Sequence, residues 1–181
     1  PIPRTLTLAL YGEMDVSVLD ELPPGRTPVE TVVISDEKLP DIVAGIGRHI
    51  QAGGQAYWVC PLVEESDASD LAAAEERAAM LTLRFGNRVG LVHGRMKGQE
   101  KDAVMERFSS GELSLLVATT VIEVGVNVPN ASLMIVEGAD RFGLAQLHQL
   151  RGRVGRGSAK STCVLLRGGS LSETSRARLA L

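Results

Sequence analysis

Three arginines, Arg151, Arg153 and Arg156, lie close together in the run from Gln149 to Arg156. A guanidinium group is planar, permanently charged and shaped for two parallel hydrogen bonds to a phosphate, a geometry that lysine does not reproduce. The run therefore indicates contact with a phosphate group that another part of the protein holds. The alternative is a solvated basic helix, which is the usual role of a charge run.

A leucine stripe leads into the arginines. Leu144, Leu147 and Leu150 recur at helical spacing, which predicts a helix from Leu144 to Val154 that docks through the stripe. The two glycines of the run would keep the edge of this helix thin where the arginines project. Arg151 is equally compatible with an interface and with a solvent-exposed surface.

A second motif lies upstream, from Leu115 to Pro129. It has the pattern of a buried strand that ends in the pair Thr119-Thr120 and is followed by a Gly-Val-Asn-Val-Pro segment beginning at Gly125. Together with the Gln-x-x-Gly-Arg-x-Gly-Arg spacing, this segment resembles motifs V and VI of the superfamily 2 helicases. The joint occurrence of the two motifs in this order is strongly specific.

Other segments narrow the resemblance to the RecG branch of that superfamily, with the transcription-repair coupling translocases as its near relatives. These segments are Pro1 to Leu6, Asp20 to Gly25, Cys60 to Ser66, Glu123 to Gly125 and Gly143 to Gly157. The resemblance covers essentially the whole chain. It implies the second RecA-like lobe of such a protein, excised from a longer chain.

The resemblance implies a nucleotide site. Arg153 and Arg156 would reach the γ-phosphate of an ATP bound by the first lobe, with Arg156 the better candidate for an arginine finger. Gln149 would order the water or the nucleotide edge. Gly125 and Asn127 match positions that approach the nucleotide and its ribose hydroxyls. The family usually has Asp where Asn127 stands, and an amide can bond a hydroxyl but brings no charge.

The resemblance also implies a DNA site. Thr119 and Thr120 resemble threonines that grip a nucleic-acid phosphate, and His93 and Arg95, in a segment like motif IVa, are candidate contacts to the DNA backbone. Hydroxyl groups and backbone amides position such a strand without reading its bases. The alternatives are a turn cap for the threonines and a satisfied turn residue for His93.

Composition predicts an α/β fold. Hydrophobic residues make up 44% of the 181 residues and aromatic residues only 3%, so the core must consist of small aliphatic side chains, as in a parallel sheet covered by helices. Apolar runs alternate with helical patterns, which favours a RecA-like three-layer fold with a mainly parallel sheet. Strands are expected at 31–34, 55–60, 89–93, 114–119, 132–137 and 161–166, and helices at 39–52, 71–85, 99–108 and 144–154.

The sequence contains no Gly-x-x-x-x-Gly-Lys-Ser/Thr loop and no acidic metal motif. The expected lobe is therefore P-loop NTPase-like but lacks the P-loop, and ATP and Mg2+ are expected to be held mainly by a missing first lobe. Residues 1–28 are expected to form an interlobe connector that carries the end of motif III. Residues 29–168 would form the second RecA-like domain, and residues 169–181 the start of a truncated helical segment.

The net charge of −3 is unevenly distributed. Residues 140–181 carry eight basic and two acidic side chains, whereas residues 64–76 carry six acidic and no basic ones. This asymmetry predicts a basic sector that faces phosphate and an acidic sector that is turned away. The helix at 71–85 is expected to have a charged face at Glu75, Glu76 and Arg77.

The cysteines and the large aromatic residues are expected in the core. Cys60 and Cys163 lie in apolar strand-like runs, which indicates buried free thiols, with a disulfide as the alternative. Trp58 and Phe85 have no basic residues interleaved with them in the sequence. They are therefore expected to be core residues rather than platforms on which bases stack.

The function implied by the resemblance is that of a second motor lobe in an ATP-dependent DNA helicase, an ATP hydrolase that remodels forks and Holliday junctions in recombination and repair. The isolated lobe is expected to be inactive. Its expected partners are branched DNA and, within the same protein, the first RecA-like lobe and an N-terminal wedge domain. No membrane partner is expected. The expected location is the bacterial cytoplasm. The alternatives are a transcription-repair coupling translocase lobe and a non-enzymatic nucleotide- or phosphate-binding α/β domain. A Rossmann dehydrogenase is disfavoured because no Gly-x-Gly-x-x-Gly follows the first strand.

Overall fold

The computed structural model describes residues 28–61, 67–119, 128–155 and 160–168. Its elements alternate between strands and helices along the chain, as the sequence predicts. They are β1 (Val29–Ser35), η1 (Asp36–Lys38), α2 (Leu39–Gln51), β2 (Gln55–Cys60), α3 (Asp67–Phe85), η2 (Gly86–Arg88), β3 (Val89–Val92), α4 (Gly98–Ser109), β4 (Leu115–Thr119), β5 (Ala131–Val136), η3 (Ala139–Arg141), α5 (Leu144–Arg151) and β6 (Ser161–Arg167).

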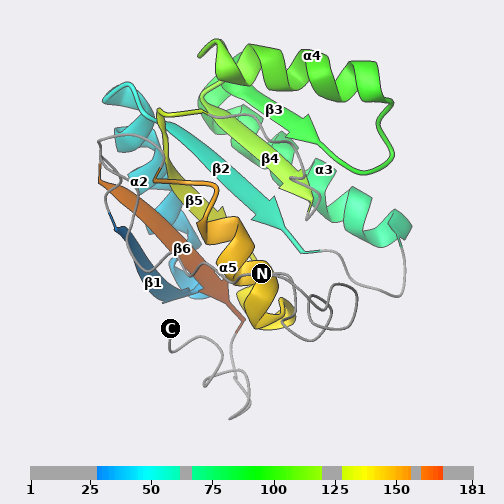
Figure 1. The fold of residues 1–181 in the computed structure, drawn as a ribbon. Coiled ribbons are helices and arrows are strands. Elements are labelled where there is room, and N and C mark those ends of the chain that lie inside the picture. Colours follow the sequence, from blue (N-terminus) through cyan, green and yellow to red (C-terminus); the bar gives the residue numbers. More distant parts are fainter. Residues whose placement is uncertain (1–27, 62–66, 120–127, 156–159, 169–181) are drawn as a thin grey trace, which may run out of the picture.

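The six strands form one parallel sheet in the order β1-β6-β5-β2-β4-β3 (Figure 1). All six strand positions expected from the sequence are occupied, and the bounds differ by at most two residues at either end. β2 lies between β5 and β4 and is buried at every position, which agrees with its apolar run from Ala56 to Cys60. Because the strands are parallel, their carboxyl ends meet at one edge of the sheet.

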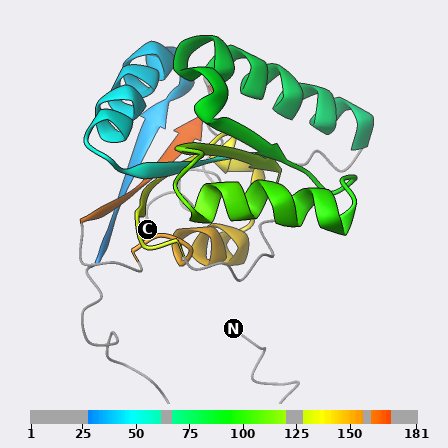
Figure 2. The same cartoon turned by 90° about the horizontal axis from the view of Figure 1, so that it is seen from above.

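Helices cover both faces of the sheet, giving the three layers expected of a RecA-like lobe (Figure 2). On one face, α2 and α3 pack over a core cluster that includes Ile46, Trp58 and Leu81. On the other face, α4 and α5 pack over a second cluster that includes Phe108 and Leu147. The expected fold class is confirmed.

α2 follows directly from its sequence. Pro40 lies in the first turn, where a missing N–H costs nothing, and Ile42, Ile46 and Ile50 recur on one buried face. The helix ends before Gly53, which has a φ of 87°, a left-handed value that glycine adopts without strain. The structure confirms the predicted isoleucine face, and the helix ends one residue earlier than expected.

α5 is shorter than the sequence suggests. The helix ends at Arg151 rather than at Val154, and the N–H of Gly152 bonds to the carbonyl of His148 as its C-cap. Glycine is about 1 kcal/mol worse than alanine inside a helix, so a glycine at 152 favours termination there. The predicted leucine stripe is also only partly buried, because Leu147 and Leu150 lie in the core while Leu144, in the first turn, is 46% exposed.

The expectations for cysteines and large aromatic residues are confirmed. Cys60 and Cys163 are buried free thiols. Trp58 is fully buried, and Phe85 is a partly buried residue that packs against the same cluster. None of the helices in the described part of the chain is long and apolar enough to cross a membrane.

Candidate nucleotide and nucleic-acid site

Two polar side chains predicted to contact DNA lie next to each other at the carboxyl edge. β3 and β4 are paired with Val92 opposite Ala118, so His93 and Thr119, one residue further on, occupy neighbouring positions. Nδ1 of His93 and Oγ1 of Thr119 are both buried without a hydrogen-bond partner in the described structure. Since buried polar atoms are normally hydrogen-bonded, a ligand that offers hydrogen bonds at this edge would satisfy an unmet requirement.

The loop after β3 presents basic side chains beside this pair. The N–H of Met96 bonds to the carbonyl of His93, and Lys101 Nζ donates to the carbonyl of Gly94 at 3.1 Å, which fixes the turn. Arg95 is exposed on this turn. Lys101, which the sequence analysis did not single out, therefore adds positive charge near Arg95, whereas Thr120 lies outside the described residues.

The end of α5 carries the described part of the arginine run. Gln149 is exposed on the helix, Arg153 is half-buried two residues after its last turn, and the N–H of Arg153 bonds to the carbonyl of Leu150. Gly155 has a φ of 78°, so the chain turns in a conformation that favours glycine directly before Arg156. Arg156, Gly125 and Asn127 lie outside the described residues. The structure thus places Gln149 and Arg153 at one helix end.

Arg151, which the sequence left open between interface and surface, is half-buried. It lies close enough to Cys163 to influence the thiol. Burial raises the pKa of Cys163 to about 11, and the positive charge of Arg151 opposes that rise. The side chain is therefore neither fully in the core nor free in solvent.

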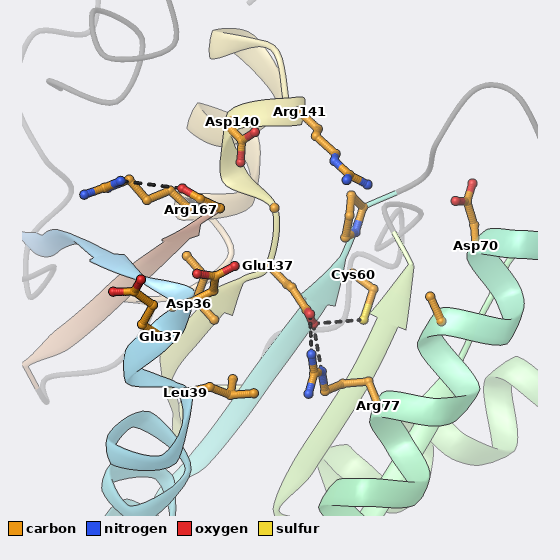
Figure 3. A pocket seen from close by; sticks show the side chains of 15 residues that line it. Asp36, Glu37, Leu39, Cys60, Asp70, Arg77, Glu137, Asp140, Arg141 and Arg167 are labelled. Carbon is orange, nitrogen blue, oxygen red and sulfur yellow. Dashed lines mark hydrogen bonds and ion pairs between the residues drawn. The ribbon is translucent and has the colours of Figure 1, made fainter. Parts of the chain in front are cut away.

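A pocket of about 600 Å3 lies at the same edge of the sheet but toward α2 and α3 (Figure 3). It is formed where β1, β2, β5 and β6 end, with charged side chains from Asp36, Arg141 and Arg167 among its walls. None of the predicted site residues that the structure describes lines it. The only sequence signal for this pocket was the presence of charged residues directly after strands.

Glu137 accepts several hydrogen bonds at this pocket. Its carboxylate accepts hydrogen bonds from Trp58 Nε1 at 2.8 Å and from Arg77 Nε and Nη2 at 2.9 and 2.5 Å. The Arg77 guanidinium lies over the Trp58 ring, 5.3 Å from its centroid. Burial opposes the charge of Arg77, but the hydrogen bond and charge of Glu137 outweigh it, and the pKa of Arg77 is raised above its ordinary value.

Two expectations about charge are wrong at this pocket. Arg77 does not lie on a charged outer face of α3, because it turns toward the sheet edge to pair with Glu137, which is sixty residues away in the sequence. Asp70, from the acidic stretch, lines the same pocket as Arg141 and Arg167, from the basic stretch. The acidic and basic sectors are therefore not separated here.

Cys60 lines the pocket as a buried free thiol. Burial, and next the charge of Glu137, raises the pKa of Cys60 to about 12, so the thiol stays protonated near neutral pH. Among the described residues, no group of three or more His, Cys, Asp or Glu side chains could hold a metal ion.

The family model of the helicase conserved C-terminal domain matches residues 36–158, and the chain belongs to this family. Among curated relatives, the chain is 56% identical over 180 residues to the ATP-dependent DNA helicase RecG of Acidithiobacillus ferridurans and 60% identical over 181 residues to that of Escherichia coli K12. Each match covers 99% of this chain but only 26% of the relative.

A solved structure of RecG bound to a three-way DNA junction matches with a TM-score of 0.81 and 44% identity, over 99% of this chain and 23% of that one. The resemblance to the RecG branch over essentially the whole chain is thereby confirmed. The chain spans about a quarter of the length of the relatives it matches.

Proposed function

We propose that this chain is the second motor lobe of an ATP-dependent DNA helicase of the RecG type, which hydrolyses ATP to remodel branched DNA in recombination and repair. The observation that carries the proposal is the end of α5, where an exposed Gln149 and a half-buried Arg153 stand in motif VI spacing on a chain 60% identical to RecG. The comparisons do not favour the coupling translocase or a non-enzymatic domain.

The arginine run supplies charge to ATP that is bound mainly by the first RecA-like lobe. When the γ-phosphoryl group is transferred, negative charge spreads over its oxygens, and a guanidinium group supplied from across the interface stabilises that charge. Arg153 and Arg156 take this part, and Gln149 orients the water or the nucleotide edge. Gly125 and Asn127 approach the nucleotide and its ribose.

Magnesium belongs to the same reaction, where it would neutralise phosphate charge. By the family resemblance, the ion would be held mainly by the first lobe together with the phosphates of ATP. Residues 29–168 then form the motor domain, residues 1–28 the connector to the first lobe, and residues 169–181 the start of the next segment.

The carboxyl ends of β3 and β4 hold the DNA backbone. Thr119 and Thr120 would donate hydrogen bonds to phosphate oxygens, and His93 and Arg95 would contact the adjoining backbone. The unpartnered atoms of His93 and Thr119 support this assignment. Branched junctions are the DNA partner, and an N-terminal wedge domain of the same protein recognises them. The protein acts in the bacterial cytoplasm, at the nucleoid.

The proposal that the first lobe binds ATP while this lobe supplies the arginines can be tested with purified proteins. The chain alone should not hydrolyse ATP, because it lacks a cradle for the β- and γ-phosphates, whereas the full-length protein should hydrolyse ATP faster when branched DNA is added. Phosphate release would be measured for both. Turnover by the isolated chain that survives further purification and is lost on mutation within the chain would contradict the proposal.

A further inference from the structure

The hydrogen bonds of Glu137 join three elements at the carboxyl edge of the sheet. The residue directly follows β5, Trp58 belongs to β2 and Arg77 to α3. Figure 3 shows the side chains of Glu137 and Arg77 pointing toward one another, and Trp58 belongs to the core cluster under α2 and α3. The Arg77 and Glu137 side chains are only 21% and 28% exposed, so the pair is shielded from bulk solvent. The hydrogen bonds and the limited exposure therefore hold the Glu137 carboxylate in one position.

The main chain at this point is fixed as well. The N–H of Glu137 donates to the carbonyl of Val59 at 2.8 Å, and Gly138 follows with a φ of 58°. A Cβ on Gly138 would lie 3.1 Å from Cγ of Pro61, so the turn fits tightly against the end of β2. The N–H of Arg141 then bonds to the carbonyl of Gly138, which closes the turn.

This turn starts the connection to α5. After η3, Phe142 is buried, and the N–H of Gly143 donates to Oε1 of Gln146 to begin the helix. Glu137 meets side chains of the core cluster under α2 and α3, whereas Leu147 of α5 belongs to the cluster on the opposite face. The connection therefore crosses the edge of the sheet from one face to the other, and Glu137 fixes its starting point.

We propose that Glu137, held by Arg77, is a positioning residue for the arginine run at the end of α5. The inference rests on the proposed function, in which that helix end meets ATP. Small displacements of catalytic groups have large effects on rate, so a residue that fixes the path into α5 acts on the chemical step without touching the nucleotide. Loss of Glu137 leaves two shielded donors, the Trp58 indole and the Arg77 guanidinium, without their acceptor, which favours rearrangement of the connection.

The test uses the full-length protein with the substitutions Glu137→Ala, Glu137→Gln and Arg77→Ala, and the double substitution Arg77→Ala/Glu137→Ala. Glu112→Gln is the matched control, since Glu112 pairs with Arg107 at 2.7 Å but both side chains are about half exposed and lie away from the connection. For each protein, kcat and KM for ATP in DNA-stimulated hydrolysis, affinity for a branched DNA, and the thermal unfolding midpoint would be measured.

Glu137→Ala should lower kcat about tenfold, the scale expected of a modest misplacement, while KM and DNA affinity stay within about twofold of wild type. Glu137→Gln keeps an acceptor for Trp58 and should recover most of the lost rate. The double variant should be no slower than Glu137→Ala, because the two residues act as one unit. Glu112→Gln should match wild type.

Three results would overturn the inference. The first is wild-type kcat in Glu137→Ala with a lower unfolding midpoint, which would mark a purely structural pair. The second is a change confined to KM or to DNA affinity. If Glu137→Ala fails to fold, Arg77→Ala decides between these results, because it removes the guanidinium that holds Glu137 and should likewise lower kcat. The third is absence of DNA-stimulated hydrolysis in the wild-type full-length protein, which would remove the proposed function itself and is thereby distinguishable from the first two.

Discussion

At the scale of single residues, the chain combines well-satisfied polar groups with a few that have no partner. Glu137 accepts hydrogen bonds from three side chains, those of Trp58, Arg77 and Cys60. Gln55 Nε2 donates to the carbonyls of Phe108 and Leu113 at 2.6 and 2.8 Å. Oγ1 of Thr119, in contrast, is buried without a partner among the described residues. Such a group lowers stability, so its presence at the end of a strand calls for a functional reason.

A substitution at Thr119 separates stability from DNA binding. Thr119→Val keeps the shape of the side chain and removes a buried hydroxyl that has no partner, so the chain should become more stable by about 1 kcal/mol. In the full-length protein the same change should weaken binding of single-stranded DNA several-fold, because a phosphate contact is lost. Urea unfolding of the chain and DNA titration of the full-length protein measure the two effects.

Thr31 provides the control, because its Oγ1 is also buried without a described partner but lies on β1, at the opposite end of the strand order. Thr31→Val should stabilise the chain in the same way and leave DNA affinity unchanged. Equal DNA affinity for Thr119→Val and wild type would argue against a contact at Thr119.

At the scale of elements, the sequence predicts those helices and strands whose positions follow from local patterns of apolar residues. Runs of Val, Ile and Leu located all six strands, and the spacing of Ile42, Ile46 and Ile50 located α2 and its buried face. The Arg77–Glu137 pair escaped prediction because its members come from a helix and a strand end that only the tertiary fold brings together. The predicted end of α5 is too late because the apolar spacing continues to Val154, past the glycine at 152 where the helix ends.

Complete burial of β2 has a consequence for the pH dependence of stability. The thiol of Cys60 has an ordinary pKa of 9.0 when unfolded and about 12 in the fold, mainly because of burial. Between these values the unfolded chain loses the proton while the folded chain keeps it, so stability falls as pH rises above 9. The contribution of Cys60 is a loss of about 1 kcal/mol per pH unit in that window.

Urea unfolding of wild type and Cys60→Ala at pH 8, 9 and 10 checks this expectation. Wild type should lose stability more steeply above pH 9 than Cys60→Ala, which has no thiol to titrate at this position. Other titrating groups affect both proteins alike, so the difference between the two slopes isolates Cys60. Parallel slopes would show that the Cys60 thiol titrates normally in the folded chain.

At the scale of the whole molecule, the sheet has two regions of possible function along its carboxyl edge. Toward α2 and α3 lies the pocket with the Glu137 hydrogen bonds, and toward β3 and β4 lie His93 and Thr119. The motif resemblance led to the second region and to α5. It also covers Cys60 and Pro61 of the pocket but gave them no role in a site. The proposed motor function requires these parts to work with a first lobe that this chain does not contain.

ATP hydrolysis by the full-length protein with Arg156 replaced tests whether this chain completes the ATPase site. A guanidinium finger contributes roughly a thousandfold or more to turnover, so Arg156→Ala should nearly abolish DNA-stimulated hydrolysis. Arg156→Lys should restore little, because an ammonium group does not reproduce the planar fork. Affinity for branched DNA should remain close to that of wild type in both variants. Hydrolysis by Arg156→Ala at the wild-type rate would contradict the assignment of this chain as the lobe that completes the ATPase site.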